Sequence, residues 1–314
     1  MSVVEEKTPP VTEGQAGKKP GNPRLKLSLI GAGMFLVFVV AYIFTLAGFQ
    51  NELTTRKLAY GSATTSGPDR VDMLVTVLTI DPIKSIMTVR LDFSPVGAYL
   101  AADGKSLNKD VLLQVNSTTG AQDRPFAKGK RMLATEVTLG LDEGDVANYP
   151  FDVYKTELDL YMTEVPAKSA AATDALETPV PTDVQFLGSV HGFKIDSALF
   201  PQSADGYNFI EITTARSTPT IAFAVVVLGV MVLMTLAVLG VVAWVVFKER
   251  KIEFAMFGWI GTLLFAFPAI RNAMPGTPPI GALPDFLAFF WVEGIVGIAM
   301  IVLVITWLKR PAGK

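Results

Sequence analysis

The feature that most constrains this chain is an uncharged apolar run from Ile221 to Phe247. As an α-helix rising about 1.5 Å per residue, this run is about 40 Å long, more than the roughly 30 Å hydrocarbon core of a bilayer. Charged residues follow at once, at 248–251. On insertion scales, a Lys or Arg at the bilayer centre costs about 2.5–3.5 kcal/mol. A soluble domain rarely leaves so long a helix without a charge, so the run predicts a membrane span.

The whole pattern of apolar runs predicts an integral membrane α+β protein with four spans. The first apolar run of the chain lies within residues 25–49. It is longer than the roughly 7–15 residues of a signal-peptide core, and no A-x-A-like cleavage site follows Ala47. This favours an uncleaved span over a signal peptide. The predicted segments are a disordered tail (1–24), a first span (25–49), a β domain (50–218), a second span (219–247), a third span (252–270), a loop (271–285), a fourth span (286–308) and a tail (309–314).

The charges flanking these spans predict their orientation. Nearly all of the positive charge that flanks the spans lies in the N-terminal tail, in the 248–251 turn and at the C-terminus, whereas the 271–285 loop holds only Arg271. Because positively charged connections stay in the cytoplasm, both termini are predicted to be cytoplasmic. The β domain and the 271–285 loop are then extracytoplasmic, in a multi-pass protein of the cell (inner) membrane.

Composition excludes several classes of function. The formal net charge of −2 is too balanced to indicate nucleic-acid binding. The chain has no Cys, which excludes disulfides, thiolate metal sites and thiol nucleophiles. Half of the residues are hydrophobic, as expected of a protein with part of its mass in lipid.

Residues 50–218 change to polar residues, turn formers and period-two alternation. In the clearest case Met87, Val89, Leu91 and Phe93 share one face, with polar residues between them. About seven or eight such segments, joined by Gly, Pro and Asp turns and inserted between spans 1 and 2, predict an antiparallel, immunoglobulin-like β-sandwich.

Glu293 and Arg271 are the candidate ligand or helix-packing residues. Glu293 is predicted about 10 Å inside the outer end of the last span, where a carboxylate is costly and tends to face protein or a water-filled cavity. Two roles stay open: a proton-relay or ligand carboxylate, and a packing residue near the interface. Arg271 is its predicted partner. Close helix contact is predicted at four glycines: Gly258, Gly261, Gly294 and Gly297.

Catalytic and metal chemistry receive little support. The acidic segment 142–145 does not have EF-hand spacing and favours a solvated turn over a calcium site. His191 is the only histidine and lacks a G-x-S-x-G context, which favours a strand-end residue over a hydrolase triad. No enzyme, no metal and no cofactor are expected.

A short motif, Tyr149-Pro150-Phe151-Asp152, opens the predicted strand that runs to Met162. It resembles the aromatic-Pro-x-Asp corner of pentameric ligand-gated channels, in which a sandwich domain precedes membrane helices. In this chain a span precedes the sandwich, and the run Phe254–Ile270 offers almost no polar residue for an ion path. The resemblance therefore concerns the domain fold, and the motif is taken as structural.

The layout as a whole covers about residues 25–310: one span, an outer β domain with its Tyr-Pro-Phe-Asp corner, then three spans. It resembles a family of actinobacterial (mycobacterial) four-span membrane proteins described as a domain of unknown function. That resemblance implies an inner-membrane envelope protein. Some mycobacterial envelope proteins of this build are similar to accessory factors for lipid export.

The sequence favours a non-catalytic membrane protein whose outer domain binds a partner protein or a lipid, with a role in cell-envelope lipid handling implied by the resemblance. The expected partners are the bilayer and an envelope lipid or membrane protein, and no nucleic acid. The alternative is a channel- or transporter-like oligomer with a polar path near Glu293.

Overall fold

The computed structural model describes residues 32–33, 35–36, 39–40, 42–43, 46–48, 59–61, 67–120, 122–165, 178–188, 190–199 and 207–310. Three predicted segments lie wholly or largely outside these residues: the tail 1–24, the first span 25–49 and the end of the tail 309–314. The chain divides into two units, Met1–Ile43 and Phe44–Lys314. The described residues of the first unit are helical, and the second unit holds the elements below.

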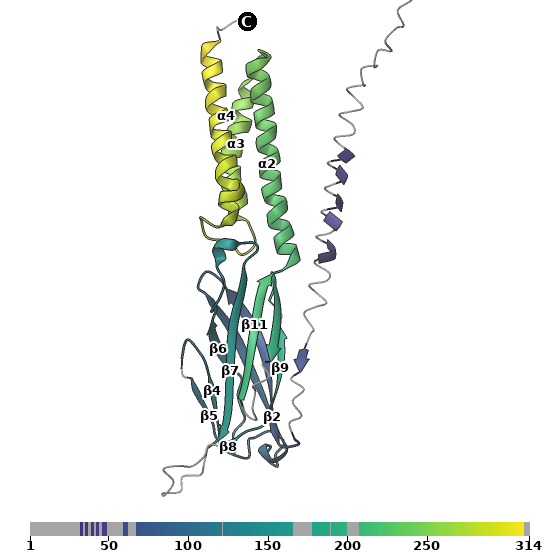
Figure 1. Cartoon of the computed structure of the whole chain (residues 1–314), viewed down its shortest axis with the longest axis vertical. Helices are drawn as coiled ribbons and strands as arrows, with labels where there is room; N and C mark the ends of the chain where they lie inside the picture. Colours follow the sequence, from purple (N-terminus) through teal and green to yellow (C-terminus); the bar gives the residue numbers. More distant parts are fainter. Residues whose placement is uncertain are drawn as a thin grey trace, which may run out of the picture. The chain divides into compact units, whose positions relative to one another are not determined.

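Residues 59–216 form a β domain of two sheets (Figure 1). The first sheet has the order β1 (Ala59–Gly61), β9 (Thr182–Gly188), β2 (Arg70–Asp81), β3 (Ile86–Val96) and β6 (Thr135–Gly140). The second has the order β10 (Phe193–Leu199), β11 (Tyr207–Arg216), β7 (Val153–Glu164), β4 (Val111–Val115) and β5 (Asp123–Phe126), with β8 (Thr178–Pro179) beside β7. Two short 3₁₀ helices, η1 (Gly97–Tyr99) and η2 (Val146–Asn148), interrupt the connections.

Alternating side chains of both sheets meet in one apolar core. In β2 every second residue from Val71 to Val77 is buried, and the residues between them are half-buried. The alternation predicted for Met87, Val89 and Leu91 is seen in β3, where all three are fully buried. The alternation of side chains therefore gives each of these strands one face that is buried in the core, as expected for a sheet with one buried face.

The prediction of antiparallel strands throughout is wrong at one pair. Strand β9 runs parallel to β2, with Val71 opposite Thr182 and Val77 opposite Gly188. Between β2 and β9 the chain forms strands of the second sheet, so the connection is long enough for β9 to pair with β2 in either a parallel or an antiparallel direction. Alternation of side chains specifies which face of a strand is buried but carries no information on strand direction.

Among the described residues, three helices are long and apolar enough to cross a membrane. They are α2 (Thr218–Phe247), α3 (Phe254–Asn272), and a third helix that begins as the π-helical segment η3 (Asp285–Phe289) and continues as α4 (Phe290–Lys309). They pack on one another around Met231, Ile260 and Val296, and Figure 1 shows them side by side beyond one end of the β domain.

Candidate functional site

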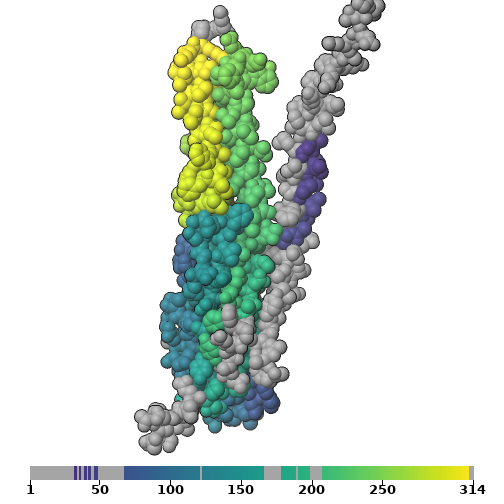
Figure 2. All heavy atoms as spheres, viewed as in Figure 1, coloured from purple at the N-terminus to yellow at the C-terminus, as the bar shows by residue number. Residues whose placement is uncertain are grey.

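The Tyr-Pro-Phe-Asp motif lies where the β domain meets the helices. It follows η2, whose N-cap Asp145 accepts a hydrogen bond from the backbone N–H of Ala147 at 2.8 Å. The Tyr149–Pro150 peptide bond is cis. Tyr149 is fully buried and packs against Ala224 of α2 and Met274 of the α3–α4 loop. Figure 2 shows teal atoms of the β domain directly below the yellow atoms of the C-terminal region.

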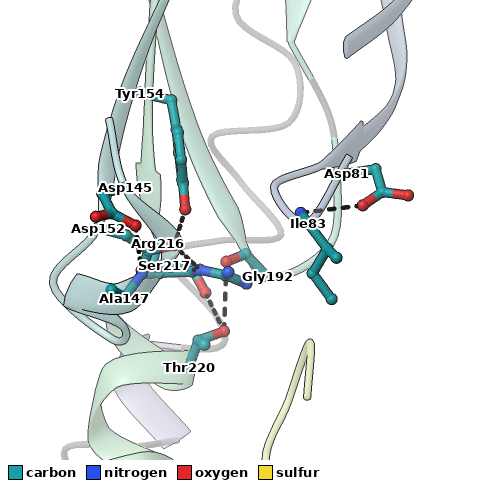
Figure 3. Close-up of polar contacts among 10 residues, drawn as sticks. All are labelled: Asp81, Ile83, Asp145, Ala147, Asp152, Tyr154, Gly192, Arg216, Ser217 and Thr220. Atoms are coloured by element: carbon teal, nitrogen blue, oxygen red, sulfur yellow. Dashed lines mark hydrogen bonds and ion pairs between the residues drawn. The ribbon is translucent and has the colours of Figure 1, made fainter. Parts of the chain in front are cut away.

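Asp152 of this motif forms a buried ion pair with Arg216, the last residue of β11. Nε of Arg216 lies 2.9 Å from Oδ2 and 3.1 Å from Oδ1 of Asp152, and the side chains are 3% and 0% exposed. The hydroxyl of Tyr154 donates to Oδ2 of Asp152 at 2.7 Å (Figure 3). Because α2 begins two residues after Arg216, the ion pair anchors the start of the helix to the β domain.

Two aromatic rings flank the Arg216 guanidinium. Its Cζ lies 5.0 Å from the ring centre of Tyr149 and 4.6 Å from that of Phe193, both within the range of cation–π contacts. Burial raises the pKa of Tyr149 to about 12. Burial, and then the hydrogen bond to Asp152, raise the pKa of Tyr154 well above its usual range. Both phenols therefore stay neutral at physiological pH.

The first turn of α2 is tied to the turn that precedes β10. The backbone N–H of Ser217 donates to the carbonyl of Gly192 at 2.9 Å. The hydroxyls of Ser217 and Thr220 lie 3.1 Å apart, and that of Thr220 donates to the Gly192 carbonyl at 3.4 Å (Figure 3). These bonds satisfy the Ser217 amide and two buried hydroxyls at the start of α2, although the Ser217 side chain does not cap the helix.

The α3–α4 loop closes over the same cluster at Gly276. Its backbone has a φ of 70°, in the left-handed region, and a Cβ atom added there would lie 2.6 Å from Nη1 of Arg216. Only glycine fits both the conformation and the close approach. Residues 149, 152, 154, 193, 216 and 276 are called the junction cluster below.

Arg271 organises the α3–α4 loop. Its guanidinium makes a two-bond contact with Asp285, at 2.8 Å and 2.7 Å, and donates to the carbonyls of Pro278 and Pro279 at 2.8 Å each. Oδ2 of Asp285 also accepts from the backbone N–H of Gly281 at 2.7 Å. Both charged side chains are almost fully buried. The prediction that Arg271 pairs with Glu293 is wrong, because Asp285 comes first along the returning chain and takes the guanidinium.

Glu293 lies in the first turn of α4 and is half-buried. Its buried Oε2 atom has no hydrogen-bond partner among the described residues. The sequence predicts helix contact at four glycines. Among the described residues it is seen at Gly261, where an added Cβ would lie 3.7 Å from Cε of Met300. Within the same part of the chain the prediction is wrong for Gly258, Gly294 and Gly297, where no atom of another helix lies within 4 Å of that position. The helices instead meet through larger apolar side chains such as Phe267 and Val292.

The remaining candidates, His191 and the acidic segment 142–145, are not members of the junction cluster. His191 lies in the turn between β9 and β10, and Asp142 to Asp145 lie in the connection between β6 and η2. Within the described part of the chain, no three His, Cys, Asp or Glu side chains come together as a metal site would require.

Sequence reasoning identified Tyr149, Asp152 and Arg271 but missed Arg216 and Asp285. Each of the two is a charged residue near the border of an apolar run, which is a feature visible in the sequence. Charges at such borders normally stay in water, so this feature did not predict that the two side chains are buried.

Comparison with known protein families divides the chain at this junction. The chain matches two families described as domains of unknown function. Residues 61–213 match one (DUF4436), and residues 216–310 match the other (DUF8686). No curated protein matches the chain. Asp152 belongs to the DUF4436 region and Arg216 is the first residue of the DUF8686 region, so the buried ion pair joins the two. These matches support the expected relationship to proteins described as domains of unknown function.

Proposed function

We propose that this chain is a non-catalytic multi-pass membrane protein whose outer β domain binds a partner protein or a lipid. The junction cluster supports this proposal most directly. Its buried Tyr149 packs against α2 and the α3–α4 loop, and its buried ion pair holds the end of β11 two residues before α2 begins, so the domain stays close to the membrane surface. A domain held in this way is suited to docking on another membrane protein or to handling lipid at that surface.

The proposed arrangement has four spans in the cell (inner) membrane, with both termini in the cytoplasm and the β domain outside. The basic residues at 248–251 and at 309–310 support this orientation, because both lie at the ends of helices remote from the β domain. A role in cell-envelope lipid handling, implied by the resemblance to actinobacterial membrane proteins, belongs to the same proposal.

Site-specific photo-cross-linking in the native membrane tests this function. The full chain would carry the cross-linker at an exposed apolar position of the β domain, either Leu133 (73% exposed) or Val165 (43% exposed), or at Phe265 of α3 (84% exposed) as the matched control. We expect a discrete membrane protein or an enriched lipid class at a β-domain position, and bulk phospholipid at Phe265. Bulk phospholipid, or no adduct, at the β-domain positions would contradict the proposal.

A second candidate is a channel- or transporter-like oligomer with a polar path near Glu293. The observation that favours it is the buried, unpartnered Oε2 atom of this carboxylate on an otherwise apolar helix. The ion pair of Arg271 with Asp285 removes Arg271 from such a path.

Glu293→Gln tests the second candidate. A channel or transporter would give an ion or proton flux in reconstituted vesicles, and this substitution would lower that flux by about tenfold or more, because the amide cannot exchange a proton. Glu253→Gln, at an exposed position at the start of α3, is the matched control and should leave the flux unchanged. Absence of flux, an equal flux in Glu293→Gln and the parent, or a monomer in native mass spectrometry would reject the channel.

A further inference from the structure

We infer that the helix-facing end of the β domain enters the headgroup zone of the bilayer through Ile83 and Phe151. This inference rests on the proposed membrane assignment and names a lipid surface as the partner. Ile83 is 61% exposed and Phe151 is 56% exposed, although both are large apolar side chains. Their position and their rigid presentation distinguish them from scattered surface hydrophobic residues.

Both side chains lie at the level of the junction cluster. Phe151 stands between the buried Pro150 and Asp152, so the fold that buries the motif turns this ring outward. Ile83 lies in the β2–β3 turn, whose Ser85 carbonyl accepts from the backbone N–H of Leu141 at 2.9 Å. Strand β3, which follows this turn, pairs its Ile86 with Gly140 of β6. The Gly140 carbonyl accepts a hydrogen bond from the Thr156 hydroxyl, near the start of β7. These contacts connect the β2–β3 turn to the end of the domain that carries the junction cluster.

The β2–β3 turn presents Ile83 in a fixed conformation. Oδ1 of Asp81 accepts from the backbone N–H groups of Ile83 and Lys84, at 3.1 Å and 3.0 Å. In Figure 3 the Ile83 side chain points away from the strands, toward the end at which α2 begins. A turn held by its own aspartate loses little conformational entropy when its apolar tip meets a surface.

Exposed apolar side chains are also found on the helical side of the junction, which points to lipid as the partner. In the α3–α4 loop Ile280 is 84% exposed, and at the start of the last helix Phe286 and Trp291 are 60% and 66% exposed. The indole N–H of Trp291 donates to the Phe286 carbonyl at 2.8 Å. Trp side chains prefer the membrane–water interface, so this aromatic group indicates the outer boundary of the hydrocarbon.

A second aromatic group indicates the other boundary. Trp307 packs against Phe254 and Phe257, with ring centres 6.0 Å and 6.4 Å apart. Along α4, Trp291 and Trp307 are about 24 Å apart, about 6 Å less than the roughly 30 Å hydrocarbon thickness. Ile83 and Phe151 then lie just beyond the outer boundary, where the headgroups add several ångströms to the bilayer.

Single-cysteine labelling tests this inference on the full chain, which has no Cys of its own. An environment-sensitive fluorophore would be attached to Ile83→Cys or Phe151→Cys in phosphatidylcholine–phosphatidylglycerol vesicles. Leu133→Cys is the matched control: this leucine is 73% exposed on the same domain, roughly 20 Å along β6 from the helix-facing end. Leu236→Cys, on the exposed face of α2, reports membrane insertion itself.

We expect lipids with a nitroxide on the headgroup to quench the fluorescence of the label at positions 83 and 151 by about twofold or more, since these positions lie within the headgroup layer. The same lipids should leave the fluorescence at position 133 nearly unchanged. Either position suffices if the other variant does not fold. Quenching at 83 and 151 no greater than at 133, while a nitroxide on the acyl chain quenches position 236, would overturn this inference alone. Absence of quenching at 236 would overturn the membrane assignment as well.

Discussion

Arg216→Ala is expected to lower the free energy of unfolding of the β domain by about 3–5 kcal/mol, the cost of leaving one partner of a buried ion pair without the other. The substitution leaves the carboxylate of Asp152 buried, with the Tyr154 hydroxyl still donating to it. It also removes the cation between the rings of Tyr149 and Phe193. For a domain of this size, the melting temperature followed by circular dichroism in detergent should fall by roughly 10 °C.

Arg90→Ala is the matched control for Arg216→Ala. Arg90 pairs with Asp92 on the same domain, but the two side chains are 49% and 35% exposed, and such surface pairs contribute about 0–1 kcal/mol. Adding Asp152→Asn to Arg216→Ala removes the buried charge and should restore part of the lost stability. Equal melting temperatures for Arg216→Ala and Arg90→Ala would show that the junction pair does not stabilise the domain.

Arg271→Ala is expected to open the α3–α4 loop without unfolding the helices. The substitution removes both bonds to Asp285 and leaves the carbonyls of Pro278 and Pro279 without this donor. Breaking a buried pair costs about 3–5 kcal/mol. The amide of Gly281, which donates to Asp285, is a direct reporter. Because each 1.4 kcal/mol changes an opening equilibrium about tenfold, the hydrogen exchange of this amide should become about a hundredfold faster or more.

The other connection between helices supplies the control for Arg271→Ala. Arg250 is exposed in the α2–α3 turn, and its Cζ lies 5.0 Å from the ring centre of Trp244. An exposed cation–π contact contributes about 0.5–1 kcal/mol, so Arg250→Ala should leave exchange at Gly281 unchanged. Asp285→Asn keeps the shape of the side chain and removes its charge, and we expect faster exchange here too. Unchanged exchange in both Arg271→Ala and Asp285→Asn would contradict the role given to this pair.

Local sequence pattern determined the elements of this protein. The uncharged run Ile221–Phe247 predicted α2, because excluding charge over such a length has few explanations other than a membrane. Alternation at Met87, Val89 and Leu91 predicted the buried face of β3, because successive side chains of a strand point to opposite faces. Both signals act over a few neighbouring residues and need no knowledge of the fold.

Only the tertiary structure decided how these elements meet. It paired Arg271 with Asp285 instead of Glu293, buried Arg216 beside Asp152, and set β9 parallel to β2. The physical reason is common to the three: each depends on how the chain folds back on itself, over 14 residues for Arg271 and Asp285 and over much longer separations for the other two. A charged residue at the end of an apolar run has the same local sequence whether it faces water or a buried partner. The packing of the sheets and helices determines which of these it does.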